Sequence, residues 1–278
     1  NAAGPSGVPI DAIRLCERLF CLAKIDNDMM IGTRMPASWK RSVLIPLYKG
    51  KGDVKECNNY RSLKLIEHAL KVLERVFEER IRGRLDISDN QMGFMPGRST
   101  VDAIFAVRQL MEKYDRVGKE IFMVFIDLEK AFDRVPREVI WWALRKKGVP
   151  EPEVRAVMEM YREAMTAVQV EGQLSEWFGV KVGVHQGSVL SPLLFAIVMD
   201  ALTEDVDKYM REFLYADDVV ILGDSWEDVG EKYVRWKEAL ESKGLKVSVR
   251  KTKAMRTGLK KLMEALSAID PCACVGGE

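Results

Sequence analysis

The chain has 278 residues, of which 47% are hydrophobic and 31% charged, a composition typical of a globular protein with enough apolar material for a core and long enough for two lobes. Its longest apolar run, Leu193 to Met199, is far too short to cross a bilayer, and the first residues lack the basic leader and apolar stretch of a signal peptide. The five cysteines are an odd number, which favours reduced thiols in an intracellular protein over a disulfide framework. Because the sequence opens without a starting Met, we expect it to be cut from a longer chain.

The net charge of +1 hides an uneven distribution. From Arg34 to Lys64, eight basic residues face two acidic ones, and Leu245 to Lys261 holds seven basic residues and no acids. Between these blocks, from Asp200 to Glu241, thirteen acids face five bases. Two basic blocks around an acidic one suit a protein that holds phosphates at its rims and metal at its centre. Three differently charged solvated faces would give the same pattern, so charge alone does not decide.

In the first half of the chain, helical periodicity predicts three helices and two β-rich apolar runs predict strands. The helices are expected over Pro9–Lys24, over Glu67–Arg84, and to about Tyr114 from a cap at either Ser99 or Thr100. The strands are expected over Ser42–Tyr48 and Tyr60–Ile66, and the glycines of Lys49–Asp53 predict a turn after the first of them.

The second half is predicted to run strand, helices, hairpin, helix, hairpin, helix, strand. These elements are expected, in order, over Glu120–Ile126, Arg137–Lys147, Glu153–Ala164, a hairpin of Thr166–Glu171 with Ser175–Val182, Pro192–Lys208, Glu212–Leu222, Trp226–Lys243 and a last strand region that begins with Leu245–Val249. This order predicts an α+β fold with a mostly antiparallel sheet and helices on one face, in contrast to an alternating parallel α/β fold.

Two adjacent carboxylates lie between two apolar runs in the segment FLYADDVVIL, Phe213 to Leu222. Neighbouring residues of a strand point to opposite faces, so Asp217 and Asp218 can serve one site only at a hairpin turn. Two like charges held this close raise each other's pKa unless a cation neutralises them. Because Asp is common in turns, a solvated pair without a function is the alternative explanation.

A third carboxylate, Asp127, ends the buried apolar strand FMVFI, where taken alone it could equally cap the following helix. Together the three acids suit phosphoryl transfer, because hard Mg²⁺ ions bind carboxylate and phosphate oxygens. Two such ions about 3.5–4 Å apart can activate a 3′-hydroxyl and stabilise a leaving pyrophosphate, as in polymerases. Asp127, Asp217 and Asp218 therefore predict a two-metal site.

Five motifs, in order, resemble those of the reverse transcriptases of non-LTR retrotransposons. FIDLEKAFDRVP resembles the first palm motif, YADD the Y/F-x-D-D box, and GVHQGSVLSPLLF (Gly183 to Phe195) the motif between them. IPLYKGKGD…NNYRSLKL (Ile45–Leu65) and QMGFMPGRSTVDAI (Gln91–Ile104) resemble fingers segments of the same group. The sequence around HQGSVLSP and EKAFDRVPRE is most similar to that of the RTE-like clade. The resemblance extends from GPSGVPIDAIR to about Thr257.

The resemblance implies the fingers and palm of a right-hand polymerase, with an antiparallel ferredoxin/RRM-like sheet in the palm. Residues 1–118 would form the fingers with part of an N-terminal extension, and residues 119–257 the palm, in which the helices of 134–165 are peripheral. Residues 258–278 would begin a thumb or connection. Because no obvious thumb follows Thr257, we expect weak and poorly processive activity from this chain alone.

The resemblance also assigns the catalytic residues. Asp127, Asp217 and Asp218, with Leu128, would contact two Mg²⁺ ions, for which Mn²⁺ could substitute. Lys251 stands where the family has a lysine that protonates the departing pyrophosphate, and an ammonium near the reacting phosphate is a sensible general acid. Arg250 and Lys253 are close enough in sequence to compete for that role.

For the incoming nucleotide, the resemblance implies Phe132, Gln186, Gly187, Arg61 and Lys49. Phe132 would lie under the sugar and leave no room for a 2′-hydroxyl, whereas without the family it would more often be a core residue. Gln186 and Gly187 would touch the nucleotide and the template, where Gly lets the backbone approach closely. Arg61 and Lys49 would bind the triphosphate, although Ser62 replaces the family's usual Pro or Gly and Lys51 competes with Lys49.

Three further residues, Gly97, Arg98 and Tyr215, are expected to contact nucleic acid, with Arg98 on the template backbone. His185 stands where many relatives have Arg or Pro, and a lone histidine is not expected to be a ligand. Cys272-x-Cys274 is a weak zinc signal without a second Cys pair, so no zinc site is expected.

The partners implied are an RNA template, a DNA primer and dNTPs, with no membrane partner and an unknown oligomeric state. An endonuclease domain is expected in the full-length polyprotein and is not recognised in this sequence. Integration would require the nucleus, after passage through the cytoplasm.

Two alternatives remain open at this point. One is a catalytically weak or inactive nucleic-acid-binding remnant of the same fold, which Ser62 and the missing flanks favour. The other is an RNA-dependent RNA polymerase with a similar palm, which Phe132 disfavours.

Overall fold

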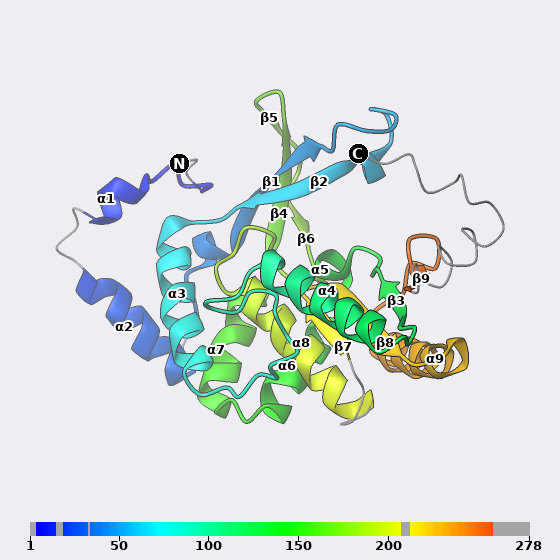
Figure 1. Cartoon of the computed structure of the whole chain (residues 1–278). Coiled ribbons are helices and arrows are strands. Elements are labelled where there is room, and N and C mark those ends of the chain that lie inside the picture. Colours follow the sequence, from blue (N-terminus) through cyan, green and yellow to red (C-terminus); the bar gives the residue numbers. More distant parts are fainter. Residues whose placement is uncertain (1–3, 15–18, 33, 207–211, 258–278) are drawn as a thin grey trace. The chain divides into compact units, whose positions relative to one another are not determined.

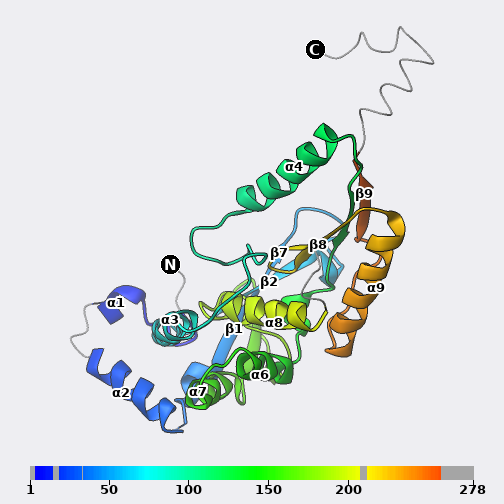
Figure 2. The same cartoon turned by 60° about the horizontal axis from the view of Figure 1, so that its bottom comes forward.

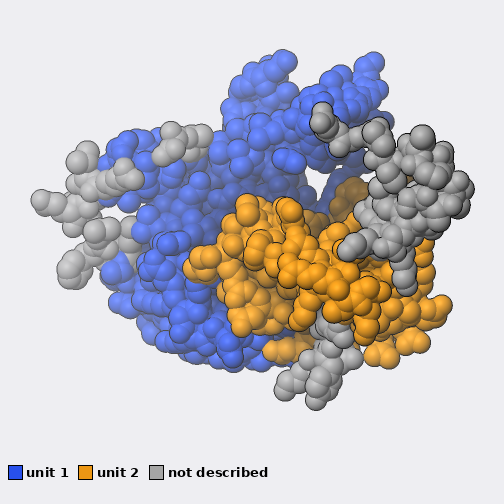
Figure 3. Space-filling view, viewed as in Figure 1, with its two compact units in different colours: residues 1–87, 130–201 blue, residues 88–129, 202–278 orange. Residues whose placement is uncertain are grey.

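The computed structural model describes residues 4–14, 19–32, 34–206 and 212–257, which form helices and strands in two compact units (Figure 1). Unit 1 comprises Asn1–Ile87 and Lys130–Ala201, and unit 2 comprises Ser88–Glu129 and Leu202–Glu278 (Figure 3). Each unit is thus built from two separate stretches of chain, whereas the predicted fingers and palm divide once, after residue 118. The division into fingers, palm and thumb stays a prediction, and both residues 258–278 and the Cys272-x-Cys274 pair lie outside the described residues.

Unit 1 contains a mixed sheet and a group of helices. Its elements are α1 (Ile10–Arg14), α2 (Leu19–Met30), η1 (Ala37–Lys40), β1 (Arg41–Tyr48), η2 (Cys57–Asn59), β2 (Tyr60–Leu65), α3 (His68–Arg82), α5 (Ala131–Arg134), α6 (Arg137–Lys146), α7 (Glu151–Tyr161), β4 (Met165–Val170), β5 (Gln173–Leu174), β6 (Phe178–Gly179) and most of α8 (Ser191–Val206). The strand order is β2-β1-β4-β5, with β6 also pairing with β4. The predicted hairpin across Gly172 is confirmed by the pairing of β4 with β5, but β4 also pairs in parallel with β1.

The core of unit 1 includes α8, in which every residue from Leu193 to Ala201 is at most 1% exposed. A helix that is apolar all round must be buried, and this one has a nearly continuous apolar sequence. Helix α3 buries one face through residues three or four positions apart, Leu70, Leu73, Phe77 and Ile81. The long predicted helix at this position is therefore confirmed.

Unit 2 contains one antiparallel sheet and two long helices. Its elements are α4 (Thr100–Arg116), β3 (Phe122–Ile126), β7 (Glu212–Tyr215), β8 (Asp218–Gly223), α9 (Trp226–Ser242) and β9 (Lys253–Arg256). The strand order is β7-β8-β3-β9, and all three pairings are antiparallel, as the sequence predicts.

The two faces of the unit 2 sheet are covered by different helices (Figure 2). Met123 and Leu222 are opposite each other in the register and pack with Ile121 against the side of α4 that carries Val107, Leu110, Met111 and Tyr114. Phe122, which points to the other face, contacts Trp226 at the start of α9 with 4.9 Å between ring centroids. Unit 2 therefore has one helix on each face of its sheet, and α4, which covers one of them, lies before the predicted palm of residues 119–257.

Two predicted boundaries differ from the structure. Within the helix expected over Pro9–Lys24 the structure describes α1 and the first part of α2, which continues to Met30, and residues 15–18 lie outside the described residues. The last strand region, expected to begin with Leu245–Val249, has one bridge there between Val247 and Leu128, and its regular strand is β9, Lys253–Arg256. None of the described helices is both long and apolar enough to cross a membrane.

Helix α4 begins with a capping box, which resolves the choice between Ser99 and Thr100. Ser99 is the N-cap, and its hydroxyl accepts a hydrogen bond from the Asp102 main-chain N–H. The Asp102 carboxylate accepts in turn from the Ser99 main-chain N–H at 2.7 Å. No residue of α4 is buried, so local interactions at its start contribute more to its stability than they do in a core helix.

Replacing Ser99 with Ala is expected to lower the free energy of unfolding by about 1 kcal/mol, because the N-cap hydroxyl is lost. Urea denaturation followed by circular dichroism would measure the change. Thr100→Ala is the matched control, since this exposed neighbour has no capping role in the structure. Equal losses for the two variants would contradict the assignment of the cap.

Candidate active site

The adjacent acids Asp217 and Asp218 lie at the tip of the β7–β8 hairpin in unit 2. Tyr215 and Asp218 are the last pair of the register, so Ala216 and Asp217 form a two-residue turn. Ala216 adopts a left-handed φ of 58°, as the first residue of such tight turns requires. The predicted hairpin tip is confirmed, and one tight turn places both carboxylates.

Gly93 lies directly against this turn. The residues before it pair with β7, through a bridge between Gln91 and Leu214 and a hydrogen bond of 2.7 Å from the Met92 N–H to the Leu214 carbonyl. A Cβ on Gly93 would lie 2.1 Å from the Ala216 nitrogen, closer than any side chain tolerates. Gly is therefore required where the QMGF segment supports the acidic turn.

Asp127 follows β3, which is the neighbour of β8 in the sheet. The antiparallel register ends with Ile126 opposite Val219, and one further step brings Asp127 opposite Asp218. The main-chain carbonyl of Asp127 accepts a hydrogen bond of 2.8 Å from Ser248, which fixes the backbone there. The three acids thus come together at one end of the sheet.

Leu128 can contact a metal only through its main-chain carbonyl, because its side chain is a hydrocarbon without a donor atom and is buried at 3% exposure. It forms an antiparallel bridge with Val247 in which the flanking residues make the hydrogen bonds. In such a pair the N–H and C=O of the central residue point away from the partner strand. The Leu128 carbonyl is therefore directed away from the segment around Val247.

Lys251 brings a positive charge against one of the acids. Its Nζ lies 3.0 Å from Oδ1 of Asp127, and its main-chain N–H donates to Ser248 within the turn that carries it. Lys251 is 61% exposed and Asp127 34%, so solvent screens much of their attraction. Of the three basic residues that the sequence offers here, the structure brings Lys251 into contact with Asp127.

Both acids at the hairpin tip have raised pKa values, so their ionised forms are disfavoured. Burial, and then the charge of Asp127, raises the pKa of Asp217. Burial, followed by the charges of Asp217 and Asp127, raises the pKa of Asp218, and the Lys251 charge opposes both shifts. A cation bound beside these carboxylates would relieve their repulsion.

Among the residues that the structure describes, no group of three or more His, Cys, Asp or Glu side chains is gathered closely enough to hold a metal ion as it stands. The chemistry of the donors nevertheless suits a hard divalent cation, because all three are carboxylates and two of them have raised pKa values. Asp127, Asp217 and Asp218 therefore fit Mg²⁺ better than a soft metal such as zinc.

Four of the five residues predicted to contact the nucleotide line one cavity of about 340 Å³ in unit 1. These are Arg61, Phe132, Gln186 and Gly187, and the remaining lining residues are His185, Ser188, Ser191 and Pro192. The Phe132 ring stacks on Phe195 of α8, with 4.5 Å between centroids and 25° between planes. The core thus fixes the ring at the edge of the cavity.

Gln186 and Gly187 are held in a fixed position at this cavity. The Gln186 side-chain amide donates to Oδ1 of Asp133 at 2.7 Å, and its main-chain carbonyl accepts from the Lys64 N–H at 2.9 Å. Gly187 has a φ of 108°, and a Cβ there would lie 2.7 Å from the Lys64 carbonyl, so only Gly fits. Asp133 was not among the predicted site residues, although it is the last acid of the FIDLEKAFDRVP motif.

The buried side chain of Tyr161 contacts both Ser191 and His185, and no sequence pattern singled it out. Its hydroxyl is 3.1 Å from Ser191 Oγ, and its ring centroid is 4.7 Å from that of His185. Burial, and then the charges of Lys64 and Arg137, lowers the pKa of His185 well below its usual value, so the ring is neutral at pH 7. His185 is therefore a neutral side chain that lines the 340 Å³ cavity.

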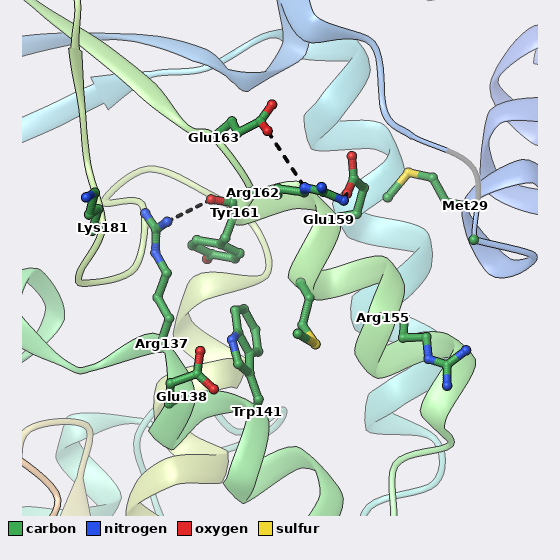
Figure 4. Close-up of a pocket in the computed structure, with 12 residues that line it drawn as sticks. Met29, Arg137, Glu138, Trp141, Arg155, Glu159, Tyr161, Arg162, Glu163 and Lys181 are labelled. Carbon is green, nitrogen blue, oxygen red and sulfur yellow. Dashed lines mark hydrogen bonds and ion pairs between the residues drawn. The ribbon is translucent and has the colours of Figure 1, made fainter.

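The opposite side of Tyr161 borders a second cavity, of about 570 Å³ (Figure 4). The Arg137 guanidinium lies 5.1 Å from the centre of the Tyr161 ring and donates a hydrogen bond of 2.7 Å to the Tyr161 carbonyl. Trp141 also lines this cavity, with its ring centroid 5.8 Å from that of Tyr161. Tyr161 is thus packed from both sides.

The other predicted contact residues are placed as follows. Lys49 does not line the 340 Å³ cavity, and its Nζ donates to a main-chain carbonyl of its own loop at 2.8 Å. The Arg98 guanidinium binds both the side chain and the main-chain carbonyl of Asp89, within unit 2. Gly97 has a φ of 74° with open space beside it, and Tyr215 is half-buried in β7. Their contacts with nucleic acid or triphosphate stay predictions.

Comparison with known families and proteins agrees with the resemblance in the motifs. Residues 49–265 match the family described as "Reverse transcriptase (RNA-dependent DNA polymerase)". The chain is 29% identical over 262 residues to the "Retrovirus-related Pol polyprotein from type-1 retrotransposable element R2" of Nasonia vitripennis, over 90% of this chain and 25% of that protein. It is 30% identical over 195 residues to the "Probable RNA-directed DNA polymerase from transposon X-element" of Drosophila melanogaster, over 67% of this chain and 21% of that protein. The chain therefore spans about a quarter of the length of the curated relatives it matches.

Among solved structures, the chain is similar to apo telomerase from Candida tropicalis truncated from its C-terminal domain. The TM-score is 0.58 at 15% identity, covering 84% of this chain and 54% of the telomerase. At this identity the likeness concerns the fold, and it confirms the predicted polymerase-like α+β architecture. The names of the relatives support the non-LTR group, while the RTE-like assignment stays a prediction. Because the family match covers most of its residues, the chain belongs to the reverse transcriptase (RNA-dependent DNA polymerase) family.

Proposed function

We propose that this chain is the polymerising part of a non-LTR retrotransposon reverse transcriptase, which extends a primer 3′-hydroxyl with dNTPs along an RNA template. The observation that supports this most directly is the convergence of Asp127, Asp217 and Asp218 at one end of the unit 2 sheet. An RNA template and a DNA primer would be its partners. The protein would act in the nucleus after synthesis in the cytoplasm.

The three acids, with the Leu128 carbonyl, would hold two Mg²⁺ ions. When bound, such ions lower the pKa of the primer 3′-hydroxyl and offset negative charge on the leaving pyrophosphate. The 3′-hydroxyl gives up its proton to water, and its oxygen forms a bond to the α-phosphorus as the bond to pyrophosphate breaks. Lys251, whose ammonium lies 3.0 Å from Asp127, is the proposed donor of the proton that pyrophosphate takes up.

The unit 1 cavity is the proposed place for the incoming nucleotide. Phe132, fixed by its stack on Phe195, would lie under the deoxyribose and exclude a 2′-hydroxyl. Arg61, on the same cavity wall, would bind triphosphate oxygens through its planar guanidinium. Gln186 and Gly187 would contact the base pair and the template backbone.

Primer extension by the purified chain tests the proposal. An oligo(dT) primer on poly(rA) with dTTP is expected to be extended with Mg²⁺ and not after chelation with EDTA, and poly(dA) in place of poly(rA) reports the preference for an RNA template. If the chain binds the duplex but extends no primer under any of these conditions, the remnant alternative is favoured. Added downstream sequence would then show whether a missing thumb is responsible.

A further inference from the structure

A carboxylate is buried in the middle of the apolar face of α3. Glu74 lies between Leu70, Leu73 and Phe77 on this helix and is 2% exposed. It makes no ion pair within the described residues, so no cation in direct contact offsets its removal from water. An ionised group in such a place is destabilising unless hydrogen bonds satisfy it.

The hydrogen bonds to Glu74 come from the loop that lines the nucleotide cavity. Ser188 Oγ donates to one carboxylate oxygen at 2.8 Å, and the Val189 N–H donates to the other at 2.9 Å. Ser188 Oγ also accepts from the N–H groups of Leu190 and Ser191, each at 3.2 Å. Glu74 therefore joins α3 to the start of α8 through the loop, where the exposed N–H groups of a helix favour a negative charge.

Because of this link, the loop is hydrogen-bonded to other elements both before and after Gly187. Before Gly187, the Lys64 N–H donates to the Gln186 carbonyl, and the Val184 N–H donates to the Phe132 carbonyl at 2.8 Å. After Gly187, Ser188 and Val189 donate their hydrogen bonds to Glu74 of α3. Loss of the carboxylate would free the second half of the loop.

We propose that Glu74 is a positioning residue for nucleotide binding, whose carboxylate holds Ser188 and Val189 and so aligns Gln186 and Gly187. This inference rests on the proposed function, because it assigns the cavity beside the loop to the incoming nucleotide. Glu74 itself touches no substrate, since α3 and the loop enclose it.

The protonation of Glu74 should tune this link. Burial raises the pKa of Glu74 to about 7, against the opposing hydrogen bonds from Ser188 and Val189 and the charge of Lys71 on α3. Charge-assisted hydrogen bonds are stronger than neutral ones, so the loop is held more tightly when Glu74 is ionised. Stability changes in the opposite sense, because the folded state keeps the proton more strongly than the unfolded state. Stability is therefore lost as pH rises from the ordinary value of 4.5 through about 7.

The other titratable groups near this site are on separate elements. On α7, burial and then the charge of Glu74 raise the pKa of Tyr161 well above its ordinary value, so it stays neutral. Lys64 on β2, next to Gln186, has a pKa lowered by burial to about 8, and its titration falls close to that of Glu74. His185 stays neutral throughout this range. A variant that changes only Glu74 separates its effect from that of Lys64.

The test compares Glu74→Ala and Glu74→Gln with Glu78→Gln. Glu78 is the matched control, because it lies one turn further along α3 and is also buried, but its partners Arg75 and Arg82 are on α3 itself. In the Ala variant, kcat/KM for dTTP is expected to fall by about 10- to 100-fold, mainly through KM, as for a misplaced substrate contact. The kcat/KM of Glu74→Gln for dTTP should equal that of the parent at pH 6 and be lower than that of the parent at pH 8. The kcat/KM of Glu78→Gln should equal that of the parent at both pH values.

Amide hydrogen exchange is a second measurement of how firmly the loop is held, and it does not require polymerase activity. In Glu74→Ala, exchange in the peptide covering residues 186–191 should accelerate by about tenfold or more, as expected where a structural hydrogen bond is lost locally, and the control should leave it unchanged. Failure of the parent to extend a primer both alone and with added downstream sequence would refute the proposed function, whereas the exchange result would still decide whether Glu74 holds the loop. Unchanged exchange and unchanged KM in both Glu74 variants, with a shifted Tm alone, would show that Glu74 is only structural and overturn the inference.

Discussion

Asp217→Asn is expected to lower the rate of primer extension by at least about 10³-fold. The substitution keeps the shape of the side chain but replaces an anionic oxygen at the hairpin tip by a neutral amide. A metal ion contributes several kcal/mol of charge stabilisation, and each loss of about 1.4 kcal/mol slows a reaction tenfold. Single-nucleotide extension with excess dTTP and Mg²⁺ would measure the difference.

The loss should not come from unfolding. Because burial raises the pKa of Asp217, the ionised carboxylate is disfavoured in the folded state, and its contribution to stability declines as pH rises through its ordinary range. A neutral Asn avoids that effect, so the variant should unfold at the same temperature as the parent or higher at pH 7 without Mg²⁺. Added Mg²⁺ should raise the Tm of the parent more than that of the variant, because a bound ion stabilises only the state that binds it.

Asp115→Asn serves as the control for Asp217→Asn. Asp115 is an exposed acid of α4 in the same unit, away from the acidic turn in sequence, and its loss changes the net charge equally. It is expected to extend primers as fast as the parent. Substantial extension by Asp217→Asn would remove this residue from the metal site, and equal impairment of both variants would point to a general effect of charge on nucleic-acid binding.

Local signals in the sequence predict the elements that position the acids. The acidic pair between two apolar runs predicts a hairpin, and the structure places Asp217 in its two-residue turn. The end of the buried run at Asp127 predicts the end of a strand, and β3 ends at Ile126. Both features depend on patterns within about ten residues, which is the range where periodicity and turn chemistry are informative.

Long-range pairing is less visible in the sequence. The parallel pairing of β1 with β4 joins Val43 to Ala167, and no local pattern specifies which distant strand a buried apolar run will select. The sequence also does not show how far the last strand region of unit 2 extends, because the residues of β9, Lys253–Arg256, are all exposed and lack the apolar alternation that marks a half-buried strand. Leu245 and Val247 have that alternation and are buried, but they contribute only one bridge.

Glu74 illustrates a functional candidate that sequence patterns hide. A charged residue within a helix is normally expected on the solvent side, and only its partners in Ser188 and Val189, more than one hundred residues away, explain its burial. Asp133 is similar, because its role depends on the Gln186 amide, which another element provides. The role of a single residue could therefore not be predicted from the sequence where its partners are distant along the chain.

Phe132→Ala is expected to raise the use of UTP relative to dTTP by about 10- to 100-fold. In the structure the Phe132 ring lines the cavity and cannot retreat, because it is stacked on Phe195 and that residue is fully buried. A 2′-hydroxyl on the nucleotide would therefore meet a fixed wall. Removing the ring abolishes the clash, and the stated change corresponds to about 1.4–2.7 kcal/mol of discrimination.

The ratio of kcat/KM for UTP to that for dTTP on poly(rA) is the quantity to measure, with Phe132→Tyr as the control. Tyr keeps the ring and should keep the preference for dTTP. The Ala variant loses a stack that is worth about 0.5–1.5 kcal/mol beyond its buried area, so its Tm must be shown to exceed the assay temperature.

The same ratio separates three explanations of Phe132. Strong preference for dTTP in the parent, lost in Phe132→Ala and kept in Phe132→Tyr, identifies the ring as the element that selects the sugar. An unchanged ratio in an Ala variant that still extends primers would make Phe132 a core residue that happens to border the cavity. A parent that uses UTP as readily as dTTP would favour an RNA-dependent RNA polymerase, because then no group in the cavity excludes the 2′-hydroxyl.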